Sequence, residues 1–163
     1  MTTNDPGFTI IIDTREQQPW EFKNYGTTVA KLDTGDYSID GLQDVVTIER
    51  KKSVNEFASN ITEKRFKDWV GRLSKLEYSF VLLEFNLEDV LKYPVGSNIP
   101  KRMWDKIKIS PNYIIKNLLE LHLNHNICVL FCDNHKNAEH IAEQIFKRIY
   151  YIEKNRRRPD ETE

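Results

Sequence analysis

The sequence has little of what membrane-bound or disulfide-rich secreted proteins require. Only two of its 163 residues are cysteines, Cys128 and Cys132, which argues against a disulfide scaffold and favours a reducing compartment. No run approaches the roughly 18 apolar residues of a membrane helix, and no N-terminal segment is typical of a signal peptide. We therefore expect a cytoplasmic, intracellular protein with no membrane association. Without repeats or low-complexity segments, we expect one domain over residues 1–155 and a polar, disordered tail at 156–163.

An excess of positive charge is also absent, since 24 lysines and arginines balance 25 acids and the net charge is −1. This balance does not by itself indicate a nucleic-acid partner. The bases are nevertheless concentrated: residues 50–75 carry eight bases against three acids, and residues 147–158 carry six against one. Such runs are usually solvated helix faces, but they can also form a local phosphate-binding surface.

The distribution of apolar residues predicts an α/β fold with a central mixed β-sheet flanked by helices. Short apolar or β-branched runs predict strands. They lie at residues 8–13, 27–32, 36–39, 45–50, 78–85 and 126–131. A helix is predicted to begin at Ser53, where Glu56 completes a capping box, and another at Ser110. Further helices are predicted at 64–76, 87–92 and 136–154.

Four acids lie at or near the ends of predicted strands: Asp13, Glu16, Asp36 and Glu49. Carboxylates that converge at one point repel each other, and each pKa would rise. A divalent cation relieves this repulsion, and Mg²⁺ typically takes one or two carboxylates together with water and a substrate phosphate. The acids therefore predict a metal site, for Mg²⁺ or Mn²⁺, at one edge of the sheet.

Glu49 and Lys51 are two residues apart on a predicted strand, so their side chains point to the same face. An acid to hold a cation and an amine to act beside it would then be presented together. The amine could orient or deprotonate a water, or stabilise charge on a phosphate. A surface ion pair is the alternative. Arg50 points to the opposite face, and we expect it to form a structural ion pair with Glu16.

The E-x-K pattern alone is common, but here it is part of a series of four motifs that stand in order. They are D-T-R-E at 13–16, G-D-Y at 35–37, I-E-R-K-K-S at 48–53 and N-I-T-E-K-R-F at 60–66, the last followed by R-L at 72–73. Together they resemble the nuclease domain of the XPF family of structure-specific DNA endonucleases, within the PD-(D/E)xK superfamily. The resemblance runs from about residue 8 to 151. It implies a restriction-endonuclease-like fold.

The resemblance also implies the roles of individual residues. Metal binding falls to Asp36 and Glu49, with Asp13 as a further acid, and catalysis to these acids with Lys51. The residues expected to support the site are Arg15, Glu16, Arg50, Asn55 and Arg65. The bases expected to contact DNA are Lys52, Lys64, Arg65, Lys67 and Arg72.

The chain departs from the family pattern in several places. Asn55 stands where the family has its last signature aspartate, which would weaken metal affinity or the support of Lys51. Trp69 stands where the family often has Gln or Glu, and we expect it in the core. We expect no tandem helix-hairpin-helix module and no helicase domain. Relatives dimerise through this end of the domain, and Phe146 and Tyr150 widen the apolar face of the last helix, so a homodimer or heterodimer is expected.

The resulting expectation is a metal-dependent DNA endonuclease that hydrolyses phosphodiester bonds at branched, flap or junction DNA, in repair or recombination. Small stand-alone members of this type resemble phage or prophage proteins. One alternative is a catalytically inactive scaffold for DNA binding or dimerisation, which Asn55 favours. Another is a restriction-like nuclease that cuts plain duplex DNA. A zinc site at Cys128 and Cys132 is disfavoured, because on one strand they would lie about 13 Å apart.

Overall fold

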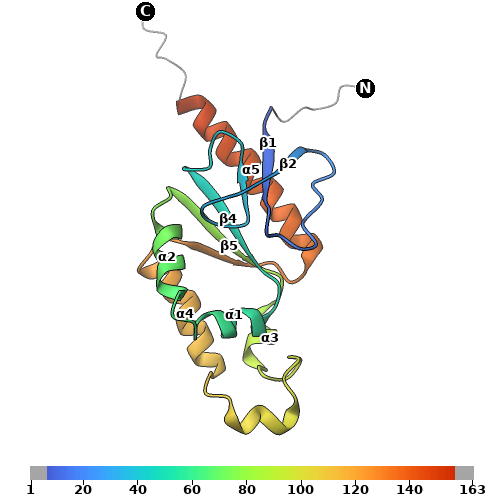
Figure 1. Cartoon of the computed structure of the whole chain (residues 1–163), viewed down its shortest axis with the longest axis vertical. Coiled ribbons are helices and arrows are strands. Elements are labelled where there is room, and N and C mark those ends of the chain that lie inside the picture. The colour runs from blue at the N-terminus through green and yellow to red at the C-terminus, as the bar shows by residue number, and fades with distance from the viewer. Residues whose placement is uncertain (1–6, 157–163) are drawn as a thin grey trace, which may run out of the picture.

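A mixed sheet of six strands forms the centre of the molecule in a computed structural model, which describes residues 7–156 (Figure 1). The strands are β1 (Thr9–Asp13), β2 (Gly26–Ala30), β3 (Tyr37–Ile39), β4 (Val46–Lys51), β5 (Tyr78–Leu83) and β6 (Cys128–Phe131). Their spatial order is β2-β1-β3-β4-β5-β6. β3 is antiparallel to both of its neighbours, and the other adjacent pairs are parallel. The predicted α/β fold with a mixed sheet is confirmed.

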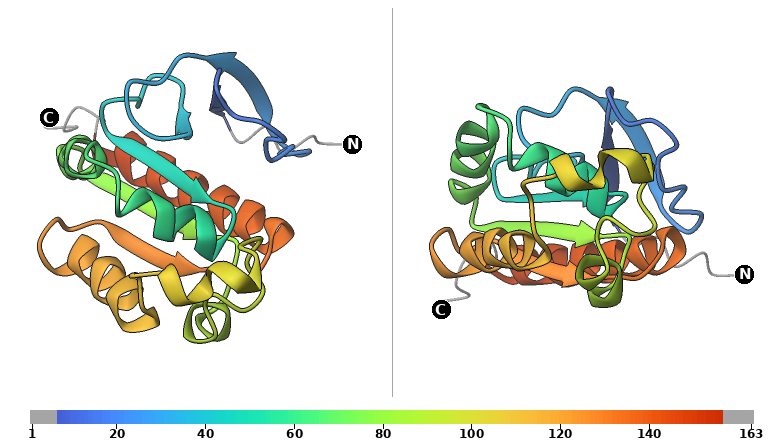
Figure 2. Two further views of the ribbon diagram at one scale, coloured as in Figure 1. Left: turned by 60° about the horizontal axis from the view of Figure 1, so that its bottom comes forward. Right: turned by 90° about the horizontal axis from the view of Figure 1, so that it is seen from below.

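The helices follow the predicted order (Figure 2). They are α1 (Val54–Asn60), α2 (Phe66–Ser74), α3 (Leu87–Leu91), η1 (Lys101–Lys106), α4 (Pro111–Leu123) and α5 (His135–Arg156). The predicted caps of α1 and α4 are present, since Ser53 and Ser110 each accept a backbone hydrogen bond at 3.1 Å. The short 3₁₀ helix η1 was not predicted. Helix α5 extends to Arg156, one residue into the predicted tail, and residues 157–163 lie outside the described part.

Helices cover both faces of the sheet, and each face has its own core. Along β5, Leu82 packs with the α5 residues in one core, whereas Val81 and Leu83 pack with α1, α2, α3 and α4 in the other. Figure 1 shows α5 crossing behind the sheet. This alternation follows from the period of two in a strand. Consecutive polar residues of β4 must therefore also point to opposite sides.

The apolar face of α5 differs from its predicted role. Phe146 is fully buried in the core of this chain. Tyr150 packs against Phe8 with ring centroids 5.0 Å apart. These two side chains therefore stabilise the fold of the single chain and do not form an exposed apolar surface for a second subunit.

Candidate active site

Asp36 is held between two strands by its own backbone. Its N–H donates to the carbonyl of Ile48 at 2.9 Å, and its carbonyl accepts from the N–H of Asp13 at 2.9 Å. Its carboxylate accepts from the N–H of Arg50 at 2.8 Å. Asp36 therefore lies beside the end of β4, where Glu49 and Lys51 also lie, although at least 13 residues separate it from them in the sequence.

Gly35 makes this placement of Asp36 possible. Its φ angle is +77°, a conformation that side chains with a Cβ rarely adopt. A Cβ atom there would lie 1.8 Å from Oγ1 of Thr47, which donates to the carbonyl of Thr34. The glycine of the G-D-Y motif is therefore needed for the close approach of this turn to β4.

Glu49 and Lys51 point to the same face of β4, as predicted, and are both largely buried. Nζ of Lys51 lies 3.4 Å from Oε1 of Glu49. It also donates to Oδ1 of Asn60 at 2.7 Å and lies 4.8 Å from the centroid of the Trp69 ring. An ammonium held by a carboxylate, an amide oxygen and an aromatic face has little freedom to move.

The two carboxylates of this cluster resist ionisation. Burial raises the pKa of Asp36 well above its ordinary value, and the nearby charges of Glu49 and Glu16 raise it further. Burial also raises the pKa of Glu49, although Lys51 and Trp69 oppose that rise. Half-buried and buried carboxylates that repel each other are a donor set that suits a hard divalent cation.

A cation held by Asp36 and Glu49 would need other ligands as well. Among residues 7–156, no group of three His, Cys, Asp or Glu side chains is arranged as a complete metal cluster. The remaining ligands would therefore come from water and a substrate phosphate, as is usual for Mg²⁺. The same observation gives no support to a zinc site within the described residues.

A pocket of about 210 Å³ opens next to Glu49 and Lys51. The residues that line it come from β4, from α2 and from the segment between α1 and α2. They are Glu49, Lys51, Asn60, Glu63, Arg65, Phe66, Trp69 and Arg72. Two exposed arginines line this pocket beside Glu49, and although Arg65 pairs with Glu63, Lys51 and Arg72 provide cationic groups that suit a phosphodiester.

Asp13 has a different role from the one predicted. Its Oδ2 accepts from Nε of Arg15 at 2.7 Å, and its Oδ1 accepts from the N–H of Leu32 at 2.8 Å. Burial alone would raise its pKa, but the hydrogen bonds from Arg15 and Leu32 outweigh burial and lower it. Asp13 thus anchors the segment that leads to Gly35, and the structure does not bring it together with Asp36 and Glu49 as a third metal ligand.

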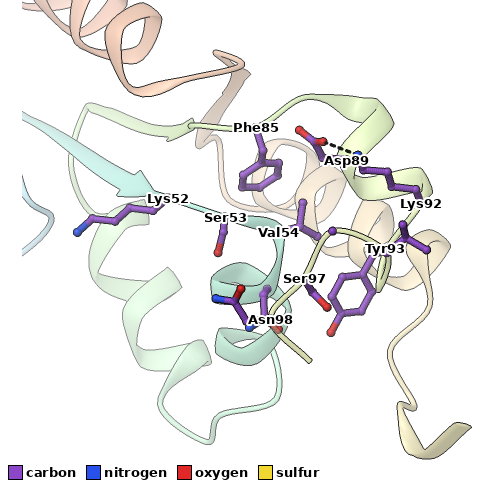
Figure 3. A pocket seen from close by; sticks show the side chains of 12 residues that line it. Lys52, Ser53, Val54, Phe85, Asp89, Lys92, Tyr93, Ser97 and Asn98 are labelled. Carbon is purple, nitrogen blue, oxygen red and sulfur yellow. Dashed lines mark ion pairs between the residues drawn. The ribbon is translucent and has the colours of Figure 1, made fainter. Parts of the chain in front are cut away.

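Asn55 is also placed differently from the expectation. It lines a separate pocket of about 220 Å³, together with Lys52, Phe85 and Tyr93 (Figure 3). The amide that contacts Lys51 belongs instead to Asn60. Asn60 stands in the N-I-T-E-K-R-F motif, so the sequence did contain a signal for it. The missing charge at residue 55 therefore does not remove a partner from Lys51.

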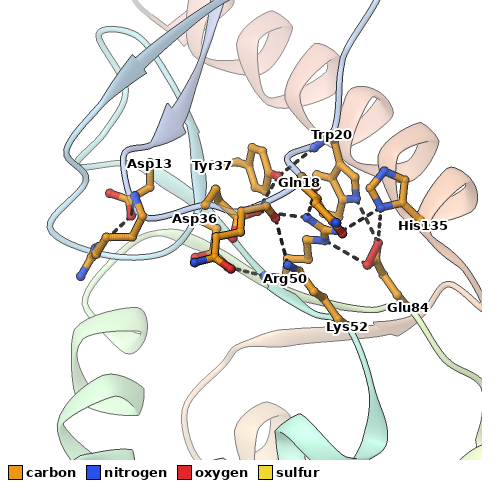
Figure 4. Close-up of polar contacts among 12 residues, drawn as sticks. Asp13, Gln18, Trp20, Asp36, Tyr37, Arg50, Lys52, Glu84 and His135 are labelled. Atoms are coloured by element: carbon orange, nitrogen blue, oxygen red, sulfur yellow. Dashed lines mark hydrogen bonds and ion pairs between the residues drawn. The ribbon is translucent and has the colours of Figure 1, made fainter.

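Arg50 lies on the opposite face of β4, inside a closed network of polar groups (Figure 4). The predicted ion pair with Glu16 is present at 3.2 Å, and a second joins Arg50 to Glu84 at 2.9 Å. Its Nη2 also donates to Nδ1 of His135 at 2.8 Å. Tyr37 donates to Glu16 at 2.6 Å. Arg15, in contrast, pairs with Asp13 and is largely exposed.

Glu84 and His135 were missed because they are distant from Arg50 in the sequence. The parallel pairing of Lys51 with Leu83 places Glu84 at the same edge of the sheet as Arg50. An acid directly after a buried strand was the only local signal for Glu84. Trp69 packs against the core, as expected, and it also lines the pocket and contacts Lys51.

The predicted DNA-contact bases divide into two groups. Arg65 and Arg72 line the pocket, and Arg65 also pairs with Glu63 at 2.6 Å. The other three, Lys52, Lys64 and Lys67, are exposed but do not line it. Nζ of Lys52 donates to the carbonyl of Gln17 at 2.9 Å.

A family model described as the ERCC4 domain matches residues 12–145, which is most of the chain. The chain belongs to the ERCC4 domain family, a family of DNA nuclease domains. This assignment agrees with the resemblance carried by the four motifs. No protein with curated annotation matches the sequence. Among the described residues, none of the helices is long and apolar enough to cross a membrane.

Two solved structures of XPF from Aeropyrum pernix share the fold. One superimposes with a TM-score of 0.61 at 19% identity and covers 86% of this chain and 65% of its own. The other, a complex with DNA, has a TM-score of 0.64 at 20% identity and covers 96% of this chain and 70% of its own. This chain therefore spans about two thirds of those proteins.

Proposed function

We propose that this protein is a Mg²⁺- or Mn²⁺-dependent DNA endonuclease that hydrolyses phosphodiester bonds. The observation that supports this most directly is the cluster at the end of β4. There the ammonium of Lys51 is held 3.4 Å from Glu49, beside Asp36, at a pocket edged by Arg65 and Arg72. Fixed positive groups beside paired carboxylates suit phosphoryl chemistry, in which negative charge builds on the phosphate oxygens.

The residues of the site have separable roles in this proposal. Asp36 and Glu49 would hold the cation, which when bound polarises the phosphate and lowers the pKa of a bound water. Lys51 stabilises the charge that develops on the phosphate oxygens. Trp69 and Asn60 hold its ammonium in place. Arg65 and Arg72 bind the adjacent DNA backbone.

We further propose that the substrate is branched, flap or junction DNA and that the role is in repair or recombination. The relative of similar fold whose structure contains DNA supports DNA as the ligand. The XPF-type motifs support a structure-specific substrate over plain duplex. The two alternative functions are an inactive scaffold and a restriction-like nuclease. The cleavage experiment below distinguishes both from a structure-specific nuclease.

A dimer remains part of the proposal, through a different surface from the one predicted. Exposed apolar side chains gather on α4 and on the edge strand β6: Leu119, Leu123, Leu130 and Phe131. An uncovered edge strand with apolar side chains favours pairing with another chain. We propose that a second subunit, either another copy of this chain or a related chain, covers this edge. A mass measurement of wild type and Leu123→Glu in solution tests this.

The cleavage experiment uses labelled duplex, flap, fork and four-way junction DNA with Mg²⁺, Mn²⁺ or EDTA. We expect metal-dependent cutting of the branched substrates, lost in Asp36→Asn and in Lys51→Ala. Exposed residues of the same charge provide matched controls, Glu88→Gln on α3 and Lys116→Ala on α4, and both should cut like wild type. Binding without cutting under every metal would overturn the nuclease proposal. Equal cutting of duplex and branched DNA would overturn the substrate preference.

A further inference from the structure

A third pocket lies along the C-terminal half of α5, beside the residue that precedes β1. It has a volume of about 510 Å³. Its lining comes from the start of β1 and from one face of α5. The lining residues are Phe8, Gln144, Lys147, Arg148, Tyr150, Tyr151 and Lys154. Because α5 packs on the opposite sheet face from α2, this pocket is separate from the catalytic one.

The charge of this pocket is of one sign. Three of its seven lining residues are bases, Lys147, Arg148 and Lys154, and within the described part of the chain none of the lining residues is acidic. The spacing of these bases places them along one side of the helix. A concave surface with three cations and no carboxylate is complementary to a polyanion.

The pocket also offers aromatic faces. Tyr151 is 56% exposed, and the guanidinium carbon of Arg148 lies 5.5 Å from the centroid of its ring. Phe8 and Tyr150 pack against each other beside it. Interspersed cations and exposed aromatic rings are the combination that binds single strands, because unpaired bases can stack while the phosphates are neutralised. Bases within a duplex cannot stack in this way.

We infer that the α5 pocket binds a single-stranded segment of DNA, with a base stacked on Tyr151 and the backbone on Lys147, Arg148 and Lys154. The inference rests on the proposed function for the choice of DNA as ligand, and it deepens that function. A DNA that engages the catalytic pocket on one sheet face and the α5 pocket on the other has arms that diverge. A flap or fork with a single-stranded arm meets that condition.

The test measures binding of fluorescein-labelled oligo(dT) and of a duplex of equal length by anisotropy, in EDTA. Tyr151→Ala should weaken oligo(dT) binding at least about fivefold, the loss expected from one stacked base, while Tyr151→Phe binds like wild type. Tyr113→Ala removes a similarly exposed tyrosine from α4 and should have no effect. Lys147→Ala should reduce the slope of log affinity against log salt by about 0.7.

Unchanged oligo(dT) binding by Tyr151→Ala would overturn the inference. If Tyr151→Ala changes the mass of the protein in solution but leaves its DNA binding unchanged, the inference is also overturned. The α5 face would then be an interface between copies of the chain. Because the assay contains no divalent metal and scores no cutting, its outcome is independent of whether the catalytic site is active. If the protein does not cut DNA but binds oligo(dT) in a way that depends on Tyr151, the proposed function is overturned and the inference about the α5 pocket is not.

Discussion

The two faces of β4 carry neighbouring charged residues that differ in how fully the protein neutralises their charge. Arg50 has partners within the protein for its whole guanidinium, since Glu16, Glu84 and His135 surround it. On the other face, burial and repulsion raise the pKa values of Asp36 and Glu49, and the Arg50 N–H, Lys51 and Trp69 only partly oppose that rise. Both faces are largely buried.

This difference separates a structural cluster from a functional one. Around Arg50, opposite charges and hydrogen bonds offset the cost of removing the ions from water. Around Asp36 and Glu49 that cost is incompletely offset, and the excess negative charge is left beside a pocket. Functional clusters commonly have such uncompensated charges, which reduce the stability of the folded protein until a cation binds.

The largest effect on stability is expected from the Arg50 face. Arg50→Met removes the cation that pairs with both Glu16 and Glu84, and leaves these carboxylates with only Tyr37, Trp20 and His135 as partners. We expect a loss of about 3–5 kcal/mol in the free energy of unfolding, measured by urea denaturation in EDTA. Lys116→Ala, on the surface of α4, is the control. A loss below about 1 kcal/mol would mean that the network is not structural.

Asp36→Asn is the matched change on the other face. It should lower the cleavage rate at least about 100-fold, because the site loses one of its two carboxylates. Its free energy of unfolding should equal or exceed that of wild type, because a repelling charge is removed while the amide oxygen can still accept from Arg50. If Asp36→Asn is both inactive and strongly destabilised, the cluster around Asp36 is structural as well, and the proposed difference between the two faces is wrong.

The pH dependence of stability should show the same contrast. The pKa values of Asp36 and Glu49 are raised above their ordinary values of 3.8 and 4.5. Protonation is therefore easier in the folded state, so the stability linked to these groups is present below about pH 4 and is lost as pH rises through the raised values. In EDTA, thermal unfolding should show this decline in wild type and less of it in Asp36→Asn.

Addition of Mg²⁺ should reverse that decline, because a cation that binds only the folded state stabilises it. The gain should grow with Mg²⁺ concentration in wild type and disappear in Asp36→Asn. Identical pH curves for the two proteins, or an equal gain from Mg²⁺, would show that residue 36 is not part of the strained pair.

The smallest effect is expected from Trp69. Its ring lies against Lys51, and its indole N–H is buried near the Glu49 carboxylate. Trp69→Leu removes the aromatic face and should lower the cleavage rate about fivefold, the equivalent of about 1 kcal/mol. Trp69→Phe keeps a ring and should act within about twofold of wild type. Equal rates for both variants would exclude the aromatic contact.

The sequence by itself determined the elements and the chemistry that depends on local spacing. The i, i+2 spacing places Glu49 and Lys51 on one side of a strand and Arg50 on the other. The caps at Ser53 and Ser110 follow from hydrogen bonds between near neighbours. The order of the four motifs was sufficient to indicate the family. Each of these properties depends on residues close together in the chain or on a pattern along it.

Only the tertiary structure decided which of the distant candidates meet. It paired the backbones of Asp13 and Asp36 but engaged the Asp13 carboxylate in hydrogen bonds with Arg15 and Leu32. It gave the support of Lys51 to Asn60 and Trp69, and it buried Phe146 in the core of one chain. These outcomes depend on strand register and helix packing, in which residues far apart in sequence compete for the same space, and no local spacing encodes the result of that competition.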